Sequence, residues 1–92
     1  MLLISYDIAD DKIRTKFSKF IRKYGHRVQY SVYEIHNSQR LLSIICAEIE
    51  ANFEEKFGKT DSVIIVPISA PNEKQIVRYG YAANDDLEYI FV

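Results

Sequence analysis

The first elements of the fold are decided by residues 2–25, which read LLISYDIADDKIRTKFSKFIRKYG. Residues 2–8 are almost all apolar and precede the polar turn Ala9-Asp10-Asp11, a pattern that predicts a central strand. The apolar residues that follow are spaced by four, three, one and three positions, as on one face of an α-helix. They are Ile13, Phe17, Phe20, Ile21 and Tyr24. The chain is therefore predicted to begin with a strand and an amphipathic helix.

The ends of this helix are marked by residues that favour helix termini. Asp10 or Asp11 is the predicted N-cap, because a carboxylate there accepts hydrogen bonds from unpaired backbone N–H groups at the positive end of the helix dipole. Gly25 is the predicted C-terminal stop. The helix is therefore expected to run from these aspartates to about Tyr24.

The rest of the chain contains one further predicted helix and four further predicted strands. The helix begins at the cap Asn37-Ser38, has apolar residues at helical spacing, Cys46 among them as a small core residue, and ends near Gly58. Pro67 predicts that the strand containing it bends or ends near an edge. The predicted strands are residues 27–35, rich in β-branched and aromatic side chains, and residues 62–68, 75–81 and 87–92.

The predicted elements that precede the last short strand follow the order β-α-β-α-β-β. This order predicts an α+β two-layer sandwich, most simply a ferredoxin-like fold. An antiparallel sheet would carry both helices on one face, and residues 1–92 would form a single domain. Strand 2–8 is apolar on both faces, with Leu3 on one side and Ile4 on the other. A monomer would leave one face in water, so we expect a homodimer that covers it. The last strand, residues 87–92, is expected to pair with the partner's sheet edge.

The composition predicts a folded domain that is neither secreted nor membrane-bound. Hydrophobic residues make up 48% of the chain and charged residues 27%, which excludes a disordered chain or a low-complexity array. The single Cys46 excludes a disulfide framework and a thiolate zinc site, and it suits a reducing compartment. No apolar run approaches the ~20 residues that span a bilayer, and the start has no signal-peptide pattern. We therefore expect a cytoplasmic protein with no membrane partner.

Positive charge is concentrated in the first predicted helix and the strand after it. Seven basic residues and no acidic one lie between Lys12 and Tyr33, so this segment carries +7 and the rest of the chain −8. Such asymmetry is typical of nucleic-acid-binding proteins, although a solvated helix face would have the same composition. Four lysines spaced by four, three and four form a stripe about 16 Å long, which suits duplex phosphates. These predicted nucleic-acid contacts are Lys12, Lys16, Lys19 and Lys23.

Asp7 is the residue best placed for chemistry. It lies near the C-terminal end of an apolar strand, just before a helix. A capping role is weakened because Asp10 and Asp11 are better placed for it. One carboxylate is a poor Mg²⁺ site, since hard cations require several oxygen ligands, but a two-fold axis could bring two copies of Asp7 together. His26 and His36 are isolated in the sequence and are predicted to be surface residues.

Three motifs in the first part of the chain are specific when combined. They are Tyr6-Asp7-Ile8, Asp10-Asp11-x-x-Arg14 and residues 24–34, which read YGHRVQYSVYE. Together they resemble the Cas-two family, small CRISPR-associated adaptation proteins described as metal-dependent endoribonucleases, and the likeness extends over essentially the whole chain. Two residues depart from the family pattern. Lys16 stands where many members carry arginine, which loses a bidentate phosphate contact, and Tyr33 replaces the more usual phenylalanine and adds a hydroxyl that needs a partner.

The resemblance implies a ferredoxin-like homodimer in which the last strand joins the partner's sheet. Asp7 of both protomers would form a shared Mg²⁺ site at the dimer interface, and Arg14 and Arg27 would contact nucleic acid. The resemblance also implies a role in spacer acquisition, in which the dimer bridges two dimers of the Cas-one integrase and holds a DNA duplex.

On this hypothesis the protein is a metal-dependent endonuclease that hydrolyses phosphodiester bonds of single-stranded RNA or duplex DNA. No His, Lys or Glu is an evident general acid, so we expect a slow enzyme. The alternatives are a non-catalytic scaffold that binds duplex DNA, a VapD-like toxin ribonuclease and a small-ligand regulatory domain. The duplex-sized lysine stripe and the full motif match argue against the toxin.

Overall fold

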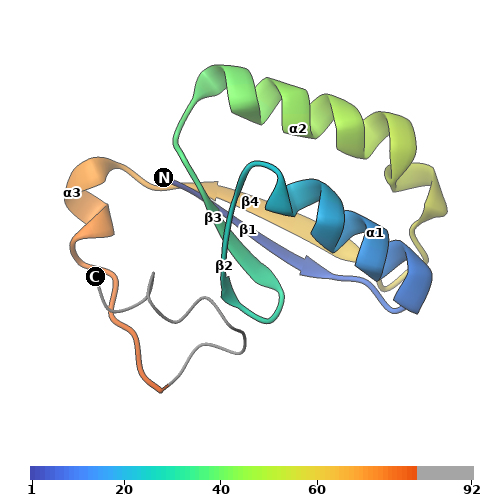
Figure 1. Cartoon of the computed structure of the whole chain (residues 1–92), viewed down its shortest axis with the longest axis horizontal. Helices are drawn as coiled ribbons and strands as arrows, with labels where there is room; N and C mark the ends of the chain where they lie inside the picture. The colour runs from blue at the N-terminus through green and yellow to red at the C-terminus, as the bar shows by residue number, and fades with distance from the viewer. Residues whose placement is uncertain (81–92) are drawn as a thin grey trace.

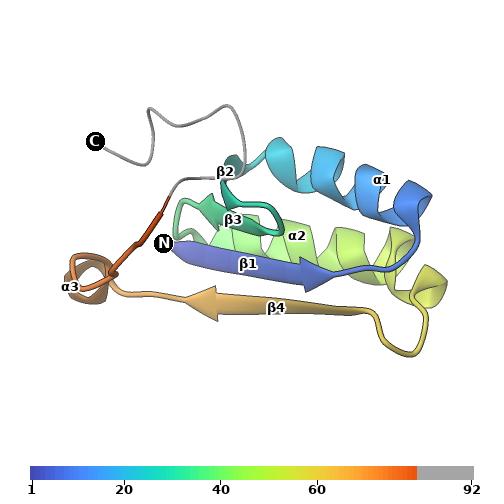
Figure 2. The same ribbon diagram turned by 90° about the horizontal axis from the view of Figure 1, so that it is seen from below.

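Four antiparallel strands form one sheet with the order β2-β3-β1-β4 in the computed structural model, which describes residues 1–80. The strands are β1 (Leu2–Asp7), β2 (Gly25–Gln29), β3 (Val32–Ile35) and β4 (Ser62–Pro67). The helices α1 (Asp11–Arg22) and α2 (Gln39–Asn52) lie on one face of this sheet (Figures 1 and 2). The βαββαβ order with β1 and β3 in the centre is a ferredoxin-like α+β fold, as predicted.

Helix α1 has the apolar face that the spacing predicts and begins at the predicted cap. The Asp10 carboxylate accepts hydrogen bonds from the backbone N–H groups of Lys12 and Ile13, at 2.9 and 3.0 Å. The helix ends at Arg22, earlier than predicted, and the prediction that Gly25 is its stop is wrong. Gly25 is instead the first residue of β2, where a side chain would collide with the backbone of Glu34.

The core lies between the sheet and the two helices. It is formed by alternate residues of β1, including Ile4 and Tyr6, and by the apolar face of α1. Phe17 is fully buried at its centre, with ring centroids of Tyr6 at 5.0 Å and Phe53 at 5.1 Å. Cys46 was predicted to be a small core residue. It is only half-buried and does not belong to the core cluster.

The predicted single strand over residues 27–35 is a hairpin of two strands. The chain turns at Tyr30 and Ser31, and the β2–β3 register shifts between Arg27 and Gln29. The Ser31 carbonyl accepts a hydrogen bond from the Tyr6 N–H at 3.1 Å, which fastens the turn to the end of β1. The prediction was wrong because the turn residues are Tyr and Ser, which interrupt a strand pattern far less than Gly, Pro or Asn.

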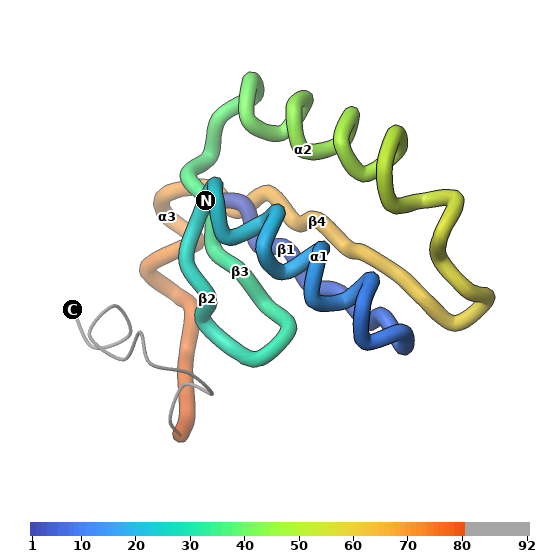
Figure 3. The backbone as a smooth tube through the Cα atoms, turned by 45° about the vertical axis from the view of Figure 1, so that its right-hand side comes forward, coloured from blue at the N-terminus to red at the C-terminus, as the bar shows by residue number. Residues whose placement is uncertain are grey.

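The chain after β4 also differs from the prediction. Strand β4 ends at Pro67 on an edge of the sheet, as expected, and α3 (Ala70–Glu73) follows, beside the N-terminus (Figure 3). The predicted strand 75–81 is absent over residues 75–80, because the Gln75 and Ile76 N–H groups continue the helical turns of α3.

Residue 81, the last of the predicted strand 75–81, lies outside the described residues. The predicted strand 87–92 also lies outside them. Among the helices of residues 1–80, none is both long and apolar enough to cross a membrane.

Candidate functional site

Asp7 is the last residue of β1 and lies on the sheet face that α1 and α2 leave uncovered. Its side chain is exposed, and Ser62 of β4 lies opposite it in register. Within residues 1–80 its carboxylate forms no hydrogen bond or ion pair, whereas the Asp10 carboxylate caps α1. Capping therefore does not account for a carboxylate at position 7.

The fit of this carboxylate to Mg²⁺ depends on a second chain. Residues 1–80 contain no group of three or more His, Cys, Asp or Glu side chains that could hold a metal ion. One Asp7 supplies too few oxygen ligands for a hard cation, but Mg²⁺ keeps several waters and is often bound by only one or two carboxylates. The donor set therefore fits Mg²⁺ if two copies of Asp7 share the ion.

The same sheet face carries an apolar patch next to Asp7. On β4, the side chains of Ile64 and Val66 are 58% and 45% exposed. Leu3 of β1 lies in register with Val66, and Ser5 lies between Val32 and Ile64. We call Leu3, Val32, Ile64 and Val66 the outer apolar patch. Large aliphatic side chains gathered on a solvent-facing sheet are typical of an interaction surface.

The turn between β1 and α1 is fastened from both sides. The Asp61 carboxylate accepts hydrogen bonds from the N–H groups of Ala9 and Gly58, at 2.9 and 2.8 Å, and these bonds lower the pKa of Asp61. The Arg14 guanidinium pairs with Asp11 and donates to the carbonyl oxygen of Ile8 at 3.0 Å. These contacts fix the direction in which the chain leaves Asp7.

The predicted nucleic-acid-binding residues form two groups that share Lys19. Lys12, Lys16 and Lys19 are exposed on α1, and Lys23 is exposed at its C-cap, as the stripe requires. Arg14, Lys19 and Arg27 also line one pocket between α1 and the β2–β3 hairpin. Sequence reasoning missed the other five residues that line the pocket, which are Tyr6, Thr15, Ser18, Arg22 and Tyr30. The four-residue spacing of Arg14, Ser18 and Arg22 was the available signal, since it places them on one flank of a helix.

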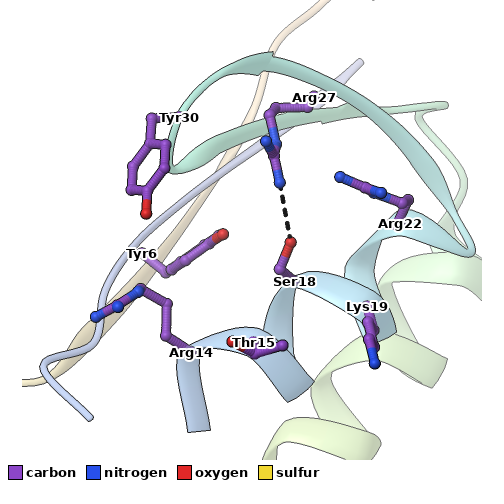
Figure 4. Close-up of a pocket in the computed structure, with 8 residues that line it drawn as sticks. All are labelled: Tyr6, Arg14, Thr15, Ser18, Lys19, Arg22, Arg27 and Tyr30. Atoms are coloured by element: carbon purple, nitrogen blue, oxygen red, sulfur yellow. Dashed lines mark hydrogen bonds between the residues drawn. The ribbon is translucent and has the colours of Figure 1, made fainter. Parts of the chain in front are cut away.

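Figure 4 shows this pocket, which has a volume of about 230 Å³. The Arg27 guanidinium points from β2 toward α1 and donates a hydrogen bond to Ser18 Oγ at 3.3 Å. Its Nε–H group donates to the Tyr33 hydroxyl at 3.1 Å. The Tyr30 ring extends from the hairpin turn and is 60% exposed. The pocket therefore joins guanidinium groups of two elements around a set of hydroxyl groups.

The hydroxyl of Tyr33, expected from the sequence to need a partner, has several. It lies 2.7 Å from Ser18 Oγ and accepts the hydrogen bond from Arg27. Burial raises the pKa of this hydroxyl, but hydrogen bonds with Ser18, Arg27 and Arg22 outweigh burial and hold the pKa below its ordinary value. The neighbouring Tyr6 has a raised pKa, chiefly because it is buried.

The pocket and Asp7 lie on opposite faces of the sheet. Tyr6 lines the pocket from the helix-covered face, where its side chain is buried. Asp7 is the next residue of the same strand, and successive side chains of a strand point to opposite faces. Arg27 and Asp7 thus belong to separate sites.

The two histidines are exposed, as predicted, but they are not isolated from each other in space. His26 and His36 line a second pocket of about 550 Å³, together with Glu34, Glu73 and the N-terminal residue. Among residues 1–80, neither this pocket nor any other place holds a group of three or more His, Cys, Asp or Glu side chains that could bind a metal ion.

Comparison with known proteins identifies the family. Residues 1–76 match the family model for CRISPR associated protein Cas2. A Rhodospirillum rubrum protein named CRISPR-associated endoribonuclease Cas2 4 is 42% identical over 65 residues, which cover 71% of this chain and 50% of that protein. A Synechocystis protein named CRISPR-associated endoribonuclease Cas2 3 is 30% identical over 87% of this chain and 84% of its own length. The chain thus spans half of the first relative and most of the second.

Two solved structures have the same fold. A hypothetical protein from Thermus thermophilus, TT1823, superposes with a TM-score of 0.65 at 31% identity, covering 74% of this chain and 79% of its own. Cas2 of Streptococcus pyogenes superposes with a TM-score of 0.70 at 23% identity, covering 86% of this chain and 98% of its own. The match to the family model over residues 1–76 shows that the chain belongs to the CRISPR-associated Cas2 family.

Proposed function

We propose that this chain acts as a homodimeric, metal-dependent endonuclease in CRISPR spacer acquisition, with Asp7 of both protomers as the catalytic and metal-binding residue. The observation that supports this most is the position of Asp7, an exposed carboxylate without a partner in residues 1–80, beside the outer apolar patch. Relatives named endoribonuclease or endonuclease support a nuclease as the activity.

The outer apolar patch supports the dimer. Ile64 and Val66 would lose most of their exposed surface if a second copy covered this face, and burial of apolar surface favours association by about 25 cal/mol per Å². A two-fold symmetric interface uses the same patch of both copies. Since Asp7 borders the patch, such an interface would also bring two carboxylates to one region.

The chain's own residues have two tasks in this reaction. The two Asp7 carboxylates would hold Mg²⁺, which when bound supplies an activated water and neutralises charge on the phosphate. The exposed lysines of α1 would bind the phosphates of the substrate backbone. Ser62, the residue in register with Asp7, does not titrate near neutral pH and is a poor general acid. We therefore expect slow cleavage.

A second candidate function is a non-catalytic scaffold that holds duplex DNA and bridges two dimers of the Cas-one integrase. It is favoured by the lysines at 12, 16, 19 and 23, which are all exposed along α1 and its C-cap. Their stripe is about 16 Å long at 1.5 Å per residue and lacks any base-reading pattern, so it suits phosphates of any sequence.

Asp7→Asn separates the two functions, because it removes the charge and keeps the size of the side chain. Wild type and variant would be assayed on labelled single-stranded RNA and duplex DNA with Mg²⁺, and duplex binding would be followed in parallel. Glu55→Gln, at another exposed carboxylate, is the control. The nuclease predicts cleavage that the Asp7 variant alone loses, with duplex binding kept in all three proteins. Absence of cleavage with intact duplex binding would favour the scaffold.

The dimer has a test of its own. Ile64→Lys places a charge in the outer apolar patch and is expected to give monomers in analytical ultracentrifugation. Lys59→Gln, in an exposed position outside this patch, should leave the mass unchanged. A wild-type protein that is monomeric at high concentration would contradict the shared Asp7 site.

A further inference from the structure

Arg14 directs its guanidinium back along α1 to the turn that follows Asp7. Its Nη1 atom donates hydrogen bonds to the carbonyl oxygens of Ile8 and Ala9, at 3.0 and 3.2 Å, and its Nη2 atom pairs with the Asp11 carboxylate. Figure 4 shows this side chain directed away from the other arginines of the pocket. Two nitrogen atoms of the guanidinium are therefore already engaged within the chain.

Helix stability does not explain a cation at this position. Arg14 is the fourth residue of α1, and its guanidinium lies against the N-terminal turn, where the helix dipole is positive and a cation is unfavourable. The ion pair with Asp11 lies at the surface, since the Asp11 side chain is 87% exposed, and such pairs contribute little to stability. What the arginine adds is its hydrogen bonding to the carbonyl oxygens of Ile8 and Ala9.

Asp61 is the second charged side chain that binds this turn. Its Oδ1 atom accepts a hydrogen bond from the Ala9 N–H group at 2.9 Å, and its Oδ2 atom accepts one from the Gly58 N–H group at 2.8 Å. Both backbone polar groups of Ala9 are thus bound by side chains of opposite charge, and the Ile8 side chain is buried in the core. We call Arg14 and Asp61 the turn clamp.

The turn clamp acts on the two residues directly after Asp7. On its other side, Asp7 is held by the strand pairing that places it opposite Ser62. Mg²⁺ demands near-ideal octahedral geometry, and a metal ligand is placed accurately only where the residues that support it are themselves fixed. An exposed carboxylate that shares an ion with a second chain therefore needs a backbone that is fixed on both sides.

We infer that Arg14 is a positioning residue, which together with Asp61 fixes the turn after Asp7 and so the direction of the Asp7 carboxylate. A bidentate phosphate contact uses the fork of N–H groups that Arg14 already directs to its own chain, so phosphate binding is left to the lysines of α1. The inference rests on the proposed metal site at Asp7. It gives Arg14 a different task from the nucleic-acid contact that the family resemblance implies.

Amide hydrogen exchange of the whole chain, followed by NMR without metal or nucleic acid, tests the turn clamp. Arg14→Gln removes the hydrogen bonds to the turn, and exchange of the Ala9 N–H is expected to become about tenfold faster. Exchange at Ile4, in the centre of the sheet, reports general destabilisation and should change much less. Arg40→Gln, at an exposed arginine in the first turn of α2, is the matched control and should change neither rate. Unchanged exchange at Ala9 in Arg14→Gln, or equal acceleration at Ala9 and Ile4, would overturn the inference.

Arg14→Lys separates the shape of the guanidinium from its charge. Lysine keeps the positive charge, but its ammonium group does not reproduce the planar fork that reaches the turn and Asp11 together. Exchange at Ala9 should therefore remain faster than in wild type, and wild-type exchange in Arg14→Lys would show that charge alone is sufficient and overturn the inference.

The salt dependence of duplex binding distinguishes positioning from phosphate contact. Arg14→Gln should leave the slope of log K against log salt concentration as it is in Arg40→Gln. A slope reduced by about 0.9 relative to this control would show a phosphate contact and overturn the inference.

Titration with Mn²⁺ connects the turn clamp to Asp7. Loss of a side chain that supports a metal ligand typically weakens metal binding 10- to 100-fold, so Arg14→Gln should raise the Kd for Mn²⁺ at least about tenfold, and Arg40→Gln should not. Wild-type affinity for Mn²⁺ in Arg14→Gln would overturn the inference. A wild type that binds no Mn²⁺ would contradict the proposed metal site alone, because exchange at Ala9 is measured without metal.

Discussion

The Oγ atom of Ser18 lies 2.7 Å from the hydroxyl oxygen of Tyr33, which joins α1 to the central strand β3. Arg27 of β2 donates to both oxygens, so three elements meet at one hydrogen-bonded group. Tyr33 is completely buried, and its hydroxyl contacts Ser18 and Arg27, which line the pocket beside α1. This arrangement orients Arg27 and gives a structural reason for tyrosine at position 33.

Tyr33→Phe should destabilise the protein modestly. The substitution keeps the buried ring and removes a hydroxyl that accepts from Arg27, and such a loss costs about 1 kcal/mol of the free energy of unfolding. Urea denaturation measures this difference, and Tyr79→Phe, at a ring that is 89% exposed, is the matched control. Equal loss in both variants would contradict the role of the hydrogen bonds.

The same hydroxyl should affect stability in alkali. Its pKa is lowered in the folded protein, because hydrogen bonds outweigh burial. Ionisation therefore adds to the free energy of unfolding above the ordinary tyrosine pKa of about 10, and the addition is lost as the pH falls through the lowered pKa. Spectrophotometric titration should show an early-ionising tyrosine in wild type that is missing in Tyr33→Phe.

Gly25→Ala should be destabilising because β2 and β3 approach closely at this residue. A Cβ atom there would overlap the carbonyl oxygen of Glu34 and lie 2.6 Å from Cγ1 of Ile35. Overpacking of this kind costs about 1–3 kcal/mol, and here the backbone itself would have to move. Gly58→Ala is the control, since its nearest neighbour would be Asp61 Oδ2 at 3.6 Å. In thermal unfolding, the Tm of Gly25→Ala should be lower than that of wild type, and the Tm of Gly58→Ala should be nearly unchanged.

Asp61 should contribute to the pH dependence of stability in acid. Hydrogen bonds from the N–H groups of Ala9 and Gly58 lower its pKa in the folded protein. The stabilisation is therefore fully present above the unfolded pKa of about 3.9 and is lost as the pH falls through the lower folded pKa. The Tm of wild type should fall more steeply than that of Asp61→Asn between pH 5 and pH 2, in steps of about half a unit. Parallel curves would show that the carboxylate is not responsible.

The lysine stripe predicts the salt dependence of duplex binding. Each phosphate contact that a lysine makes contributes about −0.9 to the slope of log K against log salt concentration. Lys12→Gln combined with Lys16→Gln should therefore reduce the slope by about two. Lys56→Gln with Lys59→Gln removes the same charge elsewhere on the surface and should leave the slope nearly unchanged. Equal effects of the two double variants would indicate a response to net charge alone.

Much of the fold could be predicted because the relevant signals are local. The spacing of Ile13, Phe17 and Phe20 places α1, and Asp10 caps it as expected. Pro67 marks the end of an edge strand. The turn at Tyr30 and Ser31 could not be predicted in the same way, because neither residue requires a special backbone conformation, Tyr favours strands and Ser is a weaker turn signal than Asn or Asp.

The site was predictable only in part, since it depends on contacts between distant elements. Asp7 could be singled out from its place at the end of an apolar strand. That Arg22 and Tyr30 share a pocket with Arg27 depends on how the β2–β3 hairpin packs beside α1, which no spacing along the chain gives. Tyr6 faces the core, and successive side chains of a strand point to opposite faces of the sheet, so Asp7 faces away from this pocket. The sequence alone does not show which face of β1 is buried.

The central claim, one metal site shared by two copies of Asp7, is tested most directly by the stoichiometry of metal binding. Mn²⁺, in place of Mg²⁺, would be titrated into the protein and the free ion measured by electron paramagnetic resonance, with no need for cleavage activity. The account predicts one tightly bound Mn²⁺ for every two chains, and none after Asp7→Ala. One ion for each chain, or unchanged binding in Asp7→Ala, would contradict it.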